Sequence, residues 1–162
     1  MSINISRSTG IVAGIYIASQ RGEPTQWAER VHVVPGRGIE GDRYFRLPGI
    51  GIDPLKTGTE LTLIEIEAIE AMRRNGVQIS PDQTRRNIAT RGVSLNDLVG
   101  KKFSIGSVVF RGVRLCEPCD YLASRTVPEV KQYMAHRGGL RADVLTDGFI
   151  QINDLITPTD KD

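Results

Sequence analysis

The two cysteines of the chain lie three positions apart, within residues 115–122. A β-prone run at residues 108–115 leads into them. Basic residues crowd the sequence around and before this segment: Arg85, Arg86, Arg91, Arg111, Arg114 and Arg125. A thiol close to positive charge ionises more readily, and the thiolate is the form that attacks electrophiles and binds metals. We therefore expect the rest of the chain to build a basic pocket around one of these two sulfurs.

Several chemistries can use two cysteines at this spacing. Cys116 and Cys119 form half of a zinc site, but the other two ligands would have to be His32 and His136, which are far apart in sequence. A thioredoxin-type redox pair belongs in a βαβ unit, and the β-rich surroundings and Pro118 fit it poorly. Two interpretations stay open. Cys119 is a single functional thiolate aimed by the turn at Pro118, or both cysteines are buried as small apolar residues.

Two further stretches can hold an anion. Residues 84–92 alternate as a strand does, which predicts Arg85 and Asn87 on one face and Arg86 on the other. Such a face is an anion site or a solvated basic edge strand. Residues 36–43 contain three glycines, but they lack the spacing of a P-loop or a dinucleotide fingerprint, which favours a plain loop.

Composition sets the class of protein. The 162 residues are 40% hydrophobic and 25% charged, and the formal net charge of +2 provides no global field for nucleic acid. Residues 1–7 lack the apolar core of a signal peptide, and no stretch reaches the roughly 20 apolar residues of a membrane span. We therefore expect one domain, residues 1–162, that is cytoplasmic and has no nucleic-acid or membrane partner.

Hydrophobic patterning predicts many short strands and few helices. Strands are expected at residues 11–18, 29–34, 61–64, 84–92, 102–110 (two strands joined by a Gly-Ser turn), 140–145 and 148–156. Helices are expected at residues 65–75 and 128–137, and a capped helical turn at residues 80–82. This pattern favours a mainly β fold with a closed sheet over alternating βαβ units.

Four motifs, in their order and spacing, resemble the MOSC domain family, named for the C-terminal domain of molybdenum-cofactor sulfurases. They are residues 38–43 (GIEGDR), 85–92 (RRNIATRG), 117–119 (EPC) and 136–145 (HRGGLRADVL). The resemblance covers most of the chain and is to standalone bacterial-type members. It implies a closed β-barrel with a few short peripheral helices, formed by about residues 10–157, which agrees with the strand pattern.

The resemblance also carries site residues onto this chain. The functional cysteine of the family corresponds to Cys119, after the proline. The arginine and asparagine of the cofactor-binding strand correspond to Arg85 and Asn87, and the glycine–aspartate motif corresponds to Gly41 and Asp42.

The ligand that the resemblance implies is a molybdenum–pterin cofactor. Molybdenum accepts a soft thiolate, so Cys119 is expected to bind molybdenum through the cofactor or to carry a persulfide that passes sulfur to the metal. The pterin phosphate needs forked donors, which Arg86 and Arg91 add to Arg85. His136 is expected to hydrogen-bond cofactor or substrate and to move protons near neutral pH, with capping of helix carbonyls as the alternative.

Two classes of function follow from this resemblance. The chain is an enzyme component, either a molybdenum-dependent reductase of N-hydroxylated substrates or a sulfur transferase, or it is a cofactor or sulfur carrier, or another anion-binding module, that turns nothing over alone. The 162 residues leave no room for the pyridoxal-phosphate desulfurase domain of larger sulfurases, and nothing resembles a flavin, haem or iron–sulfur module. A separate cysteine desulfurase or electron-donor protein is therefore the expected partner.

Overall fold

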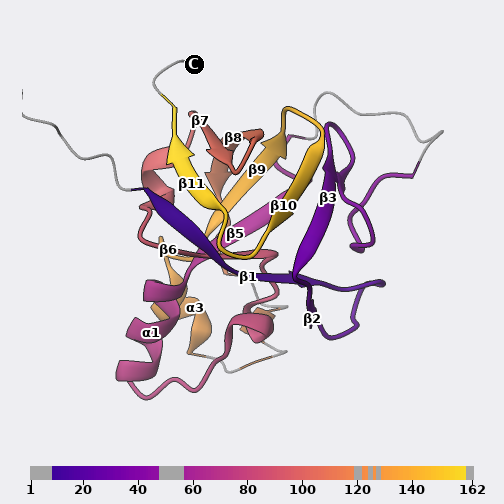
Figure 1. Ribbon diagram of the computed structural model, residues 1–162. Helices are drawn as coiled ribbons and strands as arrows, with labels where there is room; N and C mark the ends of the chain where they lie inside the picture. The colour runs from indigo at the N-terminus through magenta and orange to yellow at the C-terminus, as the bar shows by residue number, and fades with distance from the viewer. Residues whose placement is uncertain (1–8, 48–56, 119–121, 124–125, 127–128, 160–162) are drawn as a thin grey trace, which may run out of the picture.

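The computed structural model describes residues 9–47, 57–118, 122–123, 126 and 129–159 (Figure 1). The predicted ligand Cys119 and the basic residue Arg125 lie outside the described residues.

The dominant feature is a closed β-barrel, which confirms the predicted fold class. Its strands follow the order β11-β7-β8-β9-β5-β6-β1, and β11 pairs back onto β1 through Gly10 with Ile156 and Ile11 with Leu155. The strands are β1 (Gly10–Ile17), β5 (Leu61–Glu65), β6 (Ile88–Arg91), β7 (Lys102–Ile105), β8 (Val108–Leu115), β9 (Leu140–Val144) and β11 (Leu155–Pro158).

One pairing within the barrel is parallel. Strands β5 and β6 run in the same direction, with Leu63 opposite Ile88, and a parallel pair needs a crossover between its strands. Helix α1 (Ile66–Arg74) and the 3₁₀ helix η1 (Pro81–Thr84) supply that crossover. The crossover leads directly into the predicted anion-binding residues that precede β6.

A second, smaller sheet contains β10 (Gly148–Gln151), β3 (Arg30–Val34) and β4 (Gly38–Ile39), and the short strand β2 (Gln26–Trp27) pairs with the end of β1. The prediction of one strand over residues 148–156 was wrong. The chain turns between β10 and β11, where Asn153 has a φ of 73°, a left-handed conformation that asparagine tolerates better than most residues.

Two apolar clusters hold the fold together. The barrel interior is filled by alternating side chains of its strands, including Phe103 and Phe110, whose stacked ring centroids lie 5.5 Å apart. Outside the barrel, α1 packs beside the short helix α3 (Val130–Met134), as Figure 1 shows, and Met72 and Met134 are buried between them. The predicted helix at 65–75 is confirmed, whereas the one at 128–137 is much shorter. No helix in the described part of the chain is long and apolar enough to cross a membrane.

The turn before β6 differs from the prediction of a strand over residues 84–92. Helix η1 begins at the predicted cap, where the Ser80 N–H donates to Gln83 Oε1 over 2.9 Å. It ends at Arg85, whose φ of 61° is left-handed, and strand β6 starts only at Ile88. The turn, and not strand alternation, therefore sets the directions of the predicted anion-binding side chains.

Candidate functional site

An arginine-lined hollow of about 410 Å³ opens where β5 and β9 meet the turn before β6 and the loop after β4. We call it the main hollow, and its lining residues are Arg21, Arg43, Tyr44, Arg46, Thr59, Leu61, Thr62, Asn87 and Arg141. Four of them are arginines, and none of the described lining residues carries a carboxylate. Such a hollow favours an anionic ligand, because guanidinium groups present forked donors to carboxylate and phosphate.

The buried amide of Asn87 ties three strands together at the base of the main hollow. Its Oδ1 accepts from the Thr62 N–H over 3.1 Å, and its Nδ2 donates to the Tyr16 carbonyl over 3.1 Å. The Asn87 N–H in turn donates to Thr62 Oγ1 over 3.0 Å. Asn87 is only 2% exposed, so these hydrogen bonds are shielded from water and hold the base of the main hollow rigidly.

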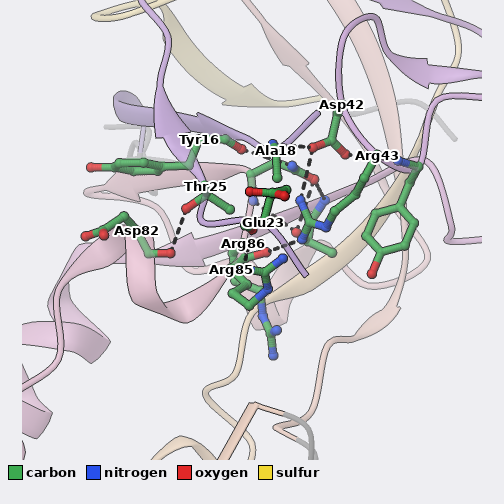
Figure 2. Close-up of polar contacts among 12 residues, drawn as sticks. Tyr16, Ala18, Glu23, Thr25, Asp42, Arg43, Asp82, Arg85 and Arg86 are labelled. Carbon is green, nitrogen blue, oxygen red and sulfur yellow. Dashed lines mark hydrogen bonds and ion pairs between the residues drawn. The ribbon is translucent and has the colours of Figure 1, made fainter. Parts of the chain in front are cut away.

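A buried ion pair supports the rim. Asp42 Oδ1 accepts from Arg43 Nη1 over 3.0 Å and from the Ala18 N–H over 3.1 Å (Figure 2). Arg43 Nη2 donates to the Arg85 carbonyl over 3.1 Å. The glycine before this pair, Gly41, has a φ of 89°, which a residue with a side chain adopts only with strain. Gly41 and Asp42 therefore lie beside the hollow, and Asp42 orients Arg43, which lines it.

A second, smaller hollow of about 260 Å³ adjoins the first. We call it the mouth hollow, and its lining residues are Arg21, Gly22, Arg43, Tyr44 and Arg85. Arg21, Arg43 and Tyr44 belong to both hollows, so the two form one continuous basic groove. Figure 2 shows Arg85 below the ion pair, with its Nη1 donating to the Glu23 carbonyl over 2.8 Å.

Arg86 is directed toward the cysteine segment, unlike its neighbours. It is 8% exposed, its Nε donates to the Gly138 carbonyl over 2.8 Å, and its Nη2 donates to the Cys116 carbonyl over 3.0 Å. The Nη2 atom also lies 3.4 Å from the Glu117 carbonyl. The buried guanidinium therefore joins the turn before β9 to the chain that leaves β8.

Close backbone packing holds the same segment. The Cys116 N–H donates to the Gly139 carbonyl over 2.7 Å, and a Cβ placed on Gly138 would lie 2.3 Å from the Cys116 carbonyl oxygen. Cys116 itself is 2% exposed, so in the structure it is a buried thiol. Arg86, Gly138 and Gly139 thus hold the backbone at Cys116, three positions before Cys119 in the sequence.

Strand pairing places the end of β8 beside β9, which carries one arginine of the main hollow. Leu115 pairs with Leu140, and Arg114 pairs with Arg141, which lines the hollow. The cysteine segment therefore starts alongside the strand that carries one of the four arginines.

Two predicted site residues lie apart from the hollows. Arg91, at the far end of β6, makes an ion pair of 3.0 Å with Glu70 on α1, and both side chains are about half exposed. His136 is 85% exposed in its side chain, with its Nδ1 atom 3.8 Å from a carboxylate oxygen of Glu117. The structure thus gathers Arg85, Asn87 and Asp42 at the groove, and places His136 beside the cysteine segment.

Most groove residues were not predicted as site residues from the sequence, among them Arg21, Tyr44, Arg46 and Arg141. Arg141 lies inside the motif at residues 136–145, and attention to its polar members could have found it. Arg21, Tyr44 and Arg46 lie in loops whose sequence carries no pattern, so only the fold reveals them.

Next to Thr59 of the main hollow lies a carboxyl pair, in which Glu60 is buried and Asp143 is partly buried. Glu60 Oε1 accepts from the N–H groups of Gly36, over 2.9 Å, and Val144, over 3.2 Å. Burial and a hydrogen bond with Asp143 raise the pKa of Glu60 to about 7. Glu60 directly follows Thr59, which lines the main hollow and accepts a hydrogen bond from Arg46 Nη2 over 2.6 Å. Within the described residues no cluster of three or more His, Cys, Asp or Glu side chains could hold a metal ion.

Comparison with known proteins agrees with the barrel fold. The family model described as the MOSC domain matches residues 56–157, and the chain therefore belongs to the MOSC domain family. No curated protein matches the chain.

Solved structures resemble the fold. The YuaD protein of Bacillus subtilis superimposes with a TM-score of 0.73 and 22% identity, over 93% of this chain and 96% of that one. YiiM of Geobacillus stearothermophilus gives a TM-score of 0.68 and 13% identity, over 93% and 75% of the two chains. YiiM of Escherichia coli gives 0.64 and 16%, over 96% and 71%. At these identities the likeness concerns the fold.

Proposed function

We propose that the main hollow binds a molybdenum–pterin cofactor and that Cys119 supplies the thiolate for molybdenum. The observation that carries this proposal is the set of four guanidinium groups that line the main hollow, of which Arg43 is ion-paired with Asp42, beside the strand that leads into the cysteine segment. The residues fit the group, because a pterin phosphate needs cationic donors and the hollow's volume of about 410 Å³ lies within the ordinary range of cofactor sites.

Some residues of the chain would bind the cofactor, and others would position the cysteine segment. Arg21 and Arg141 line the hollow without a hydrogen-bonded partner among the described residues, so their donors are available to the phosphate. Asn87 and Thr62 present fixed polar edges to the pterin heteroatoms. Arg86 positions the cysteine segment. The cofactor contacts expected for Arg91 and His136 stay predictions.

The bound cofactor supplies two-electron oxygen-atom transfer at molybdenum, which suits reduction of N-hydroxylated substrates with electrons from a separate donor protein. The groove's residues hold the anion and keep its phosphate oriented. One observation favours the carrier alternative: no described lining residue of the main hollow is a carboxylate or a histidine, so these walls provide binding donors but no ordinary general base.

The test of cofactor binding is the molybdenum and pterin content of protein purified from a host that makes the cofactor. Wild type is expected to carry both in about equal amounts. Arg141→Gln is expected to lose most of both, since a charge-assisted phosphate contact contributes roughly 1.5–3 kcal/mol. Arg74→Gln, which removes an exposed arginine from α1, is the matched control. Equal content in the two variants would overturn the assignment of the hollow.

A second assay separates enzyme from carrier. Cofactor-loaded protein is mixed with a hydroxylamine substrate and an artificial electron donor, and product formation is followed over many turnovers. Multiple turnovers that Cys119→Ser abolishes support the reductase. Full cofactor content without turnover supports the carrier.

A further inference from the structure

The mouth hollow combines an aromatic ring with three arginines. Its wall contains Tyr44, a residue that is 45% exposed. The Tyr44 ring lies near two guanidinium groups. The Cζ atom of Arg43 lies 4.6 Å from the ring centroid, and that of Arg21 lies 5.6 Å from it. Arg85 lines the same hollow. A small cavity is therefore walled by one aromatic ring and three planar cations.

This wall selects a class of ligand. Aromatic rings and guanidinium planes are the two side-chain surfaces on which nucleobases stack. Arginine presents only hydrogen-bond donors, so the complementary ring is planar and rich in acceptors, as a purine is. Two other hollows nearby each include a carboxylate, Asp82 in one and Glu23 in the other, whereas the described lining of the mouth hollow has none.

The position of the mouth hollow links a ring to a phosphate. It shares Arg21, Arg43 and Tyr44 with the main hollow, so a ligand whose phosphate lies among the guanidinium groups of the main hollow can extend a ring into the mouth hollow. An unsubstituted phosphate, or a pterin phosphate that ends there, has no ring to place in the mouth hollow.

We propose that the mouth hollow is a base subsite, so that the groove binds a nucleotide with its phosphate in the main hollow and its base over Tyr44. The inference rests on the proposed function in one respect, that the same guanidinium groups take a phosphate. The nucleotide is a free nucleoside phosphate or the extension of the pterin phosphate in a dinucleotide form of the cofactor, and the chemistry of recognition is the same for both.

The direct test compares three probes on the full chain produced without cofactor: GMP, guanosine and ribose 5-phosphate, measured by calorimetry. GMP is expected to bind at least about tenfold more tightly than ribose 5-phosphate, because stacking of one base on an aromatic ring is worth that much or more. Guanosine, which lacks the phosphate, is expected to bind more weakly than GMP. Equal affinities for GMP and ribose 5-phosphate would overturn the base subsite.

Variants at Tyr44 separate stacking from general damage to the groove. Tyr44→Ala is expected to lower GMP affinity to the level of ribose 5-phosphate and to leave ribose 5-phosphate affinity unchanged, whereas Tyr44→Phe keeps the preference. Tyr133→Ala, at an exposed tyrosine of α3, is the matched control. If Tyr44→Ala weakens both probes by the same factor, the tyrosine is structural and the inference fails.

The source of the nucleotide is identified by releasing bound ligand from protein made in a cofactor-producing host. Nucleotide released in equal amount with pterin means the dinucleotide cofactor, and nucleotide released without pterin means a free nucleotide. Molybdenum and pterin in a protein that shows no preference for GMP would leave the proposed function standing and remove the base subsite. A preference for GMP without molybdenum or pterin would do the opposite.

Discussion

The guanidinium Nη2 of Arg86 donates to the backbone carbonyl of Cys116 over 3.0 Å. Arg86 stands between Arg85 and Asn87, which line the two hollows, yet its own buried side chain reaches away to the cysteine segment. Three consecutive residues thus build the groove and hold the chain that carries Cys119. This contact joins the residues that line the groove to the backbone of Cys116, three positions before Cys119.

Replacing Arg86 with Met is expected to lower the free energy of unfolding by about 2–4 kcal/mol, because carbonyl groups of two segments lose a buried charged donor. Arg86→Lys should restore only part of this loss, since an ammonium cannot span both segments as the fork does. Urea denaturation measures the change, with exposed Arg74→Gln as the control. A loss below about 0.5 kcal/mol in the Met variant would show that the contact is not stabilising.

Gly138→Ala tests the packing under the cysteine segment. The new Cβ would lie 2.3 Å from the Cys116 carbonyl oxygen, and backbone cannot move aside cheaply. We expect a loss of about 2–4 kcal/mol. Gly76→Ala is the matched control, because its φ is 84° but its Cβ meets nothing within 4 Å, so it costs only about 1–2 kcal/mol of backbone strain. Equal losses in the two variants would argue that contact with Cys116 contributes nothing.

The sequence predicted much of the fold because its local signals agree with tertiary packing. Helix α1 was predicted from its early acids, its late arginines and the apolar face of Ile66, Ile69 and Met72, and the turn of η1 from its Ser80 cap. The parallel pairing of β5 with β6 and the closure of β11 on β1 were not predicted individually, because both join residues distant in sequence.

The site was predicted less fully than the fold. The resemblance led to Arg85, Asn87 and Asp42, which lie at the groove. Strand alternation separated Arg86 from Arg85 and Asn87, but it did not indicate that Arg86 is the buried one; the turn with the left-handed φ of 61° at Arg85 sets that difference. The position of Tyr44 likewise follows from the loop after β4, which has no periodic pattern.

Stability is expected to depend on pH through Glu60. Burial and the hydrogen bond with Asp143 raise the pKa of Glu60 to about 7, above the ordinary value of 4.5. The stability tied to the protonated form is fully present below pH 4.5 and is lost as pH rises through about 7. Glu60→Gln, which keeps an oxygen acceptor, should raise the melting temperature at pH 8 by a few degrees and flatten its dependence between pH 5 and 8. Parallel profiles for wild type and variant would contradict this account.

His32 is expected to titrate above its ordinary value. Its Nε2 lies 2.8 Å from Asp147 and its Nδ1 lies 3.1 Å from Glu40, and these hydrogen bonds raise the pKa of His32 above 6.5. The contribution of these two hydrogen bonds to the stability of the fold is therefore fully present below pH 6.5. It is lost as pH rises through the raised pKa of His32. Proton NMR of the imidazole measures it, with His136→Gln assigning the resonances of the two histidines. Asp147→Asn should lower the midpoint, and an unmoved midpoint would refute the role of that carboxylate.

The most direct measurement of the central claim is a native mass spectrum of the wild-type protein made in a host that produces the cofactor. The arginine-lined main hollow predicts a mass increment that contains molybdenum and pterin, and its reduction to a minor species in Arg141→Gln. A spectrum of the bare chain, or of the chain with only added sulfur on a cysteine, would contradict the assignment of this hollow to the cofactor.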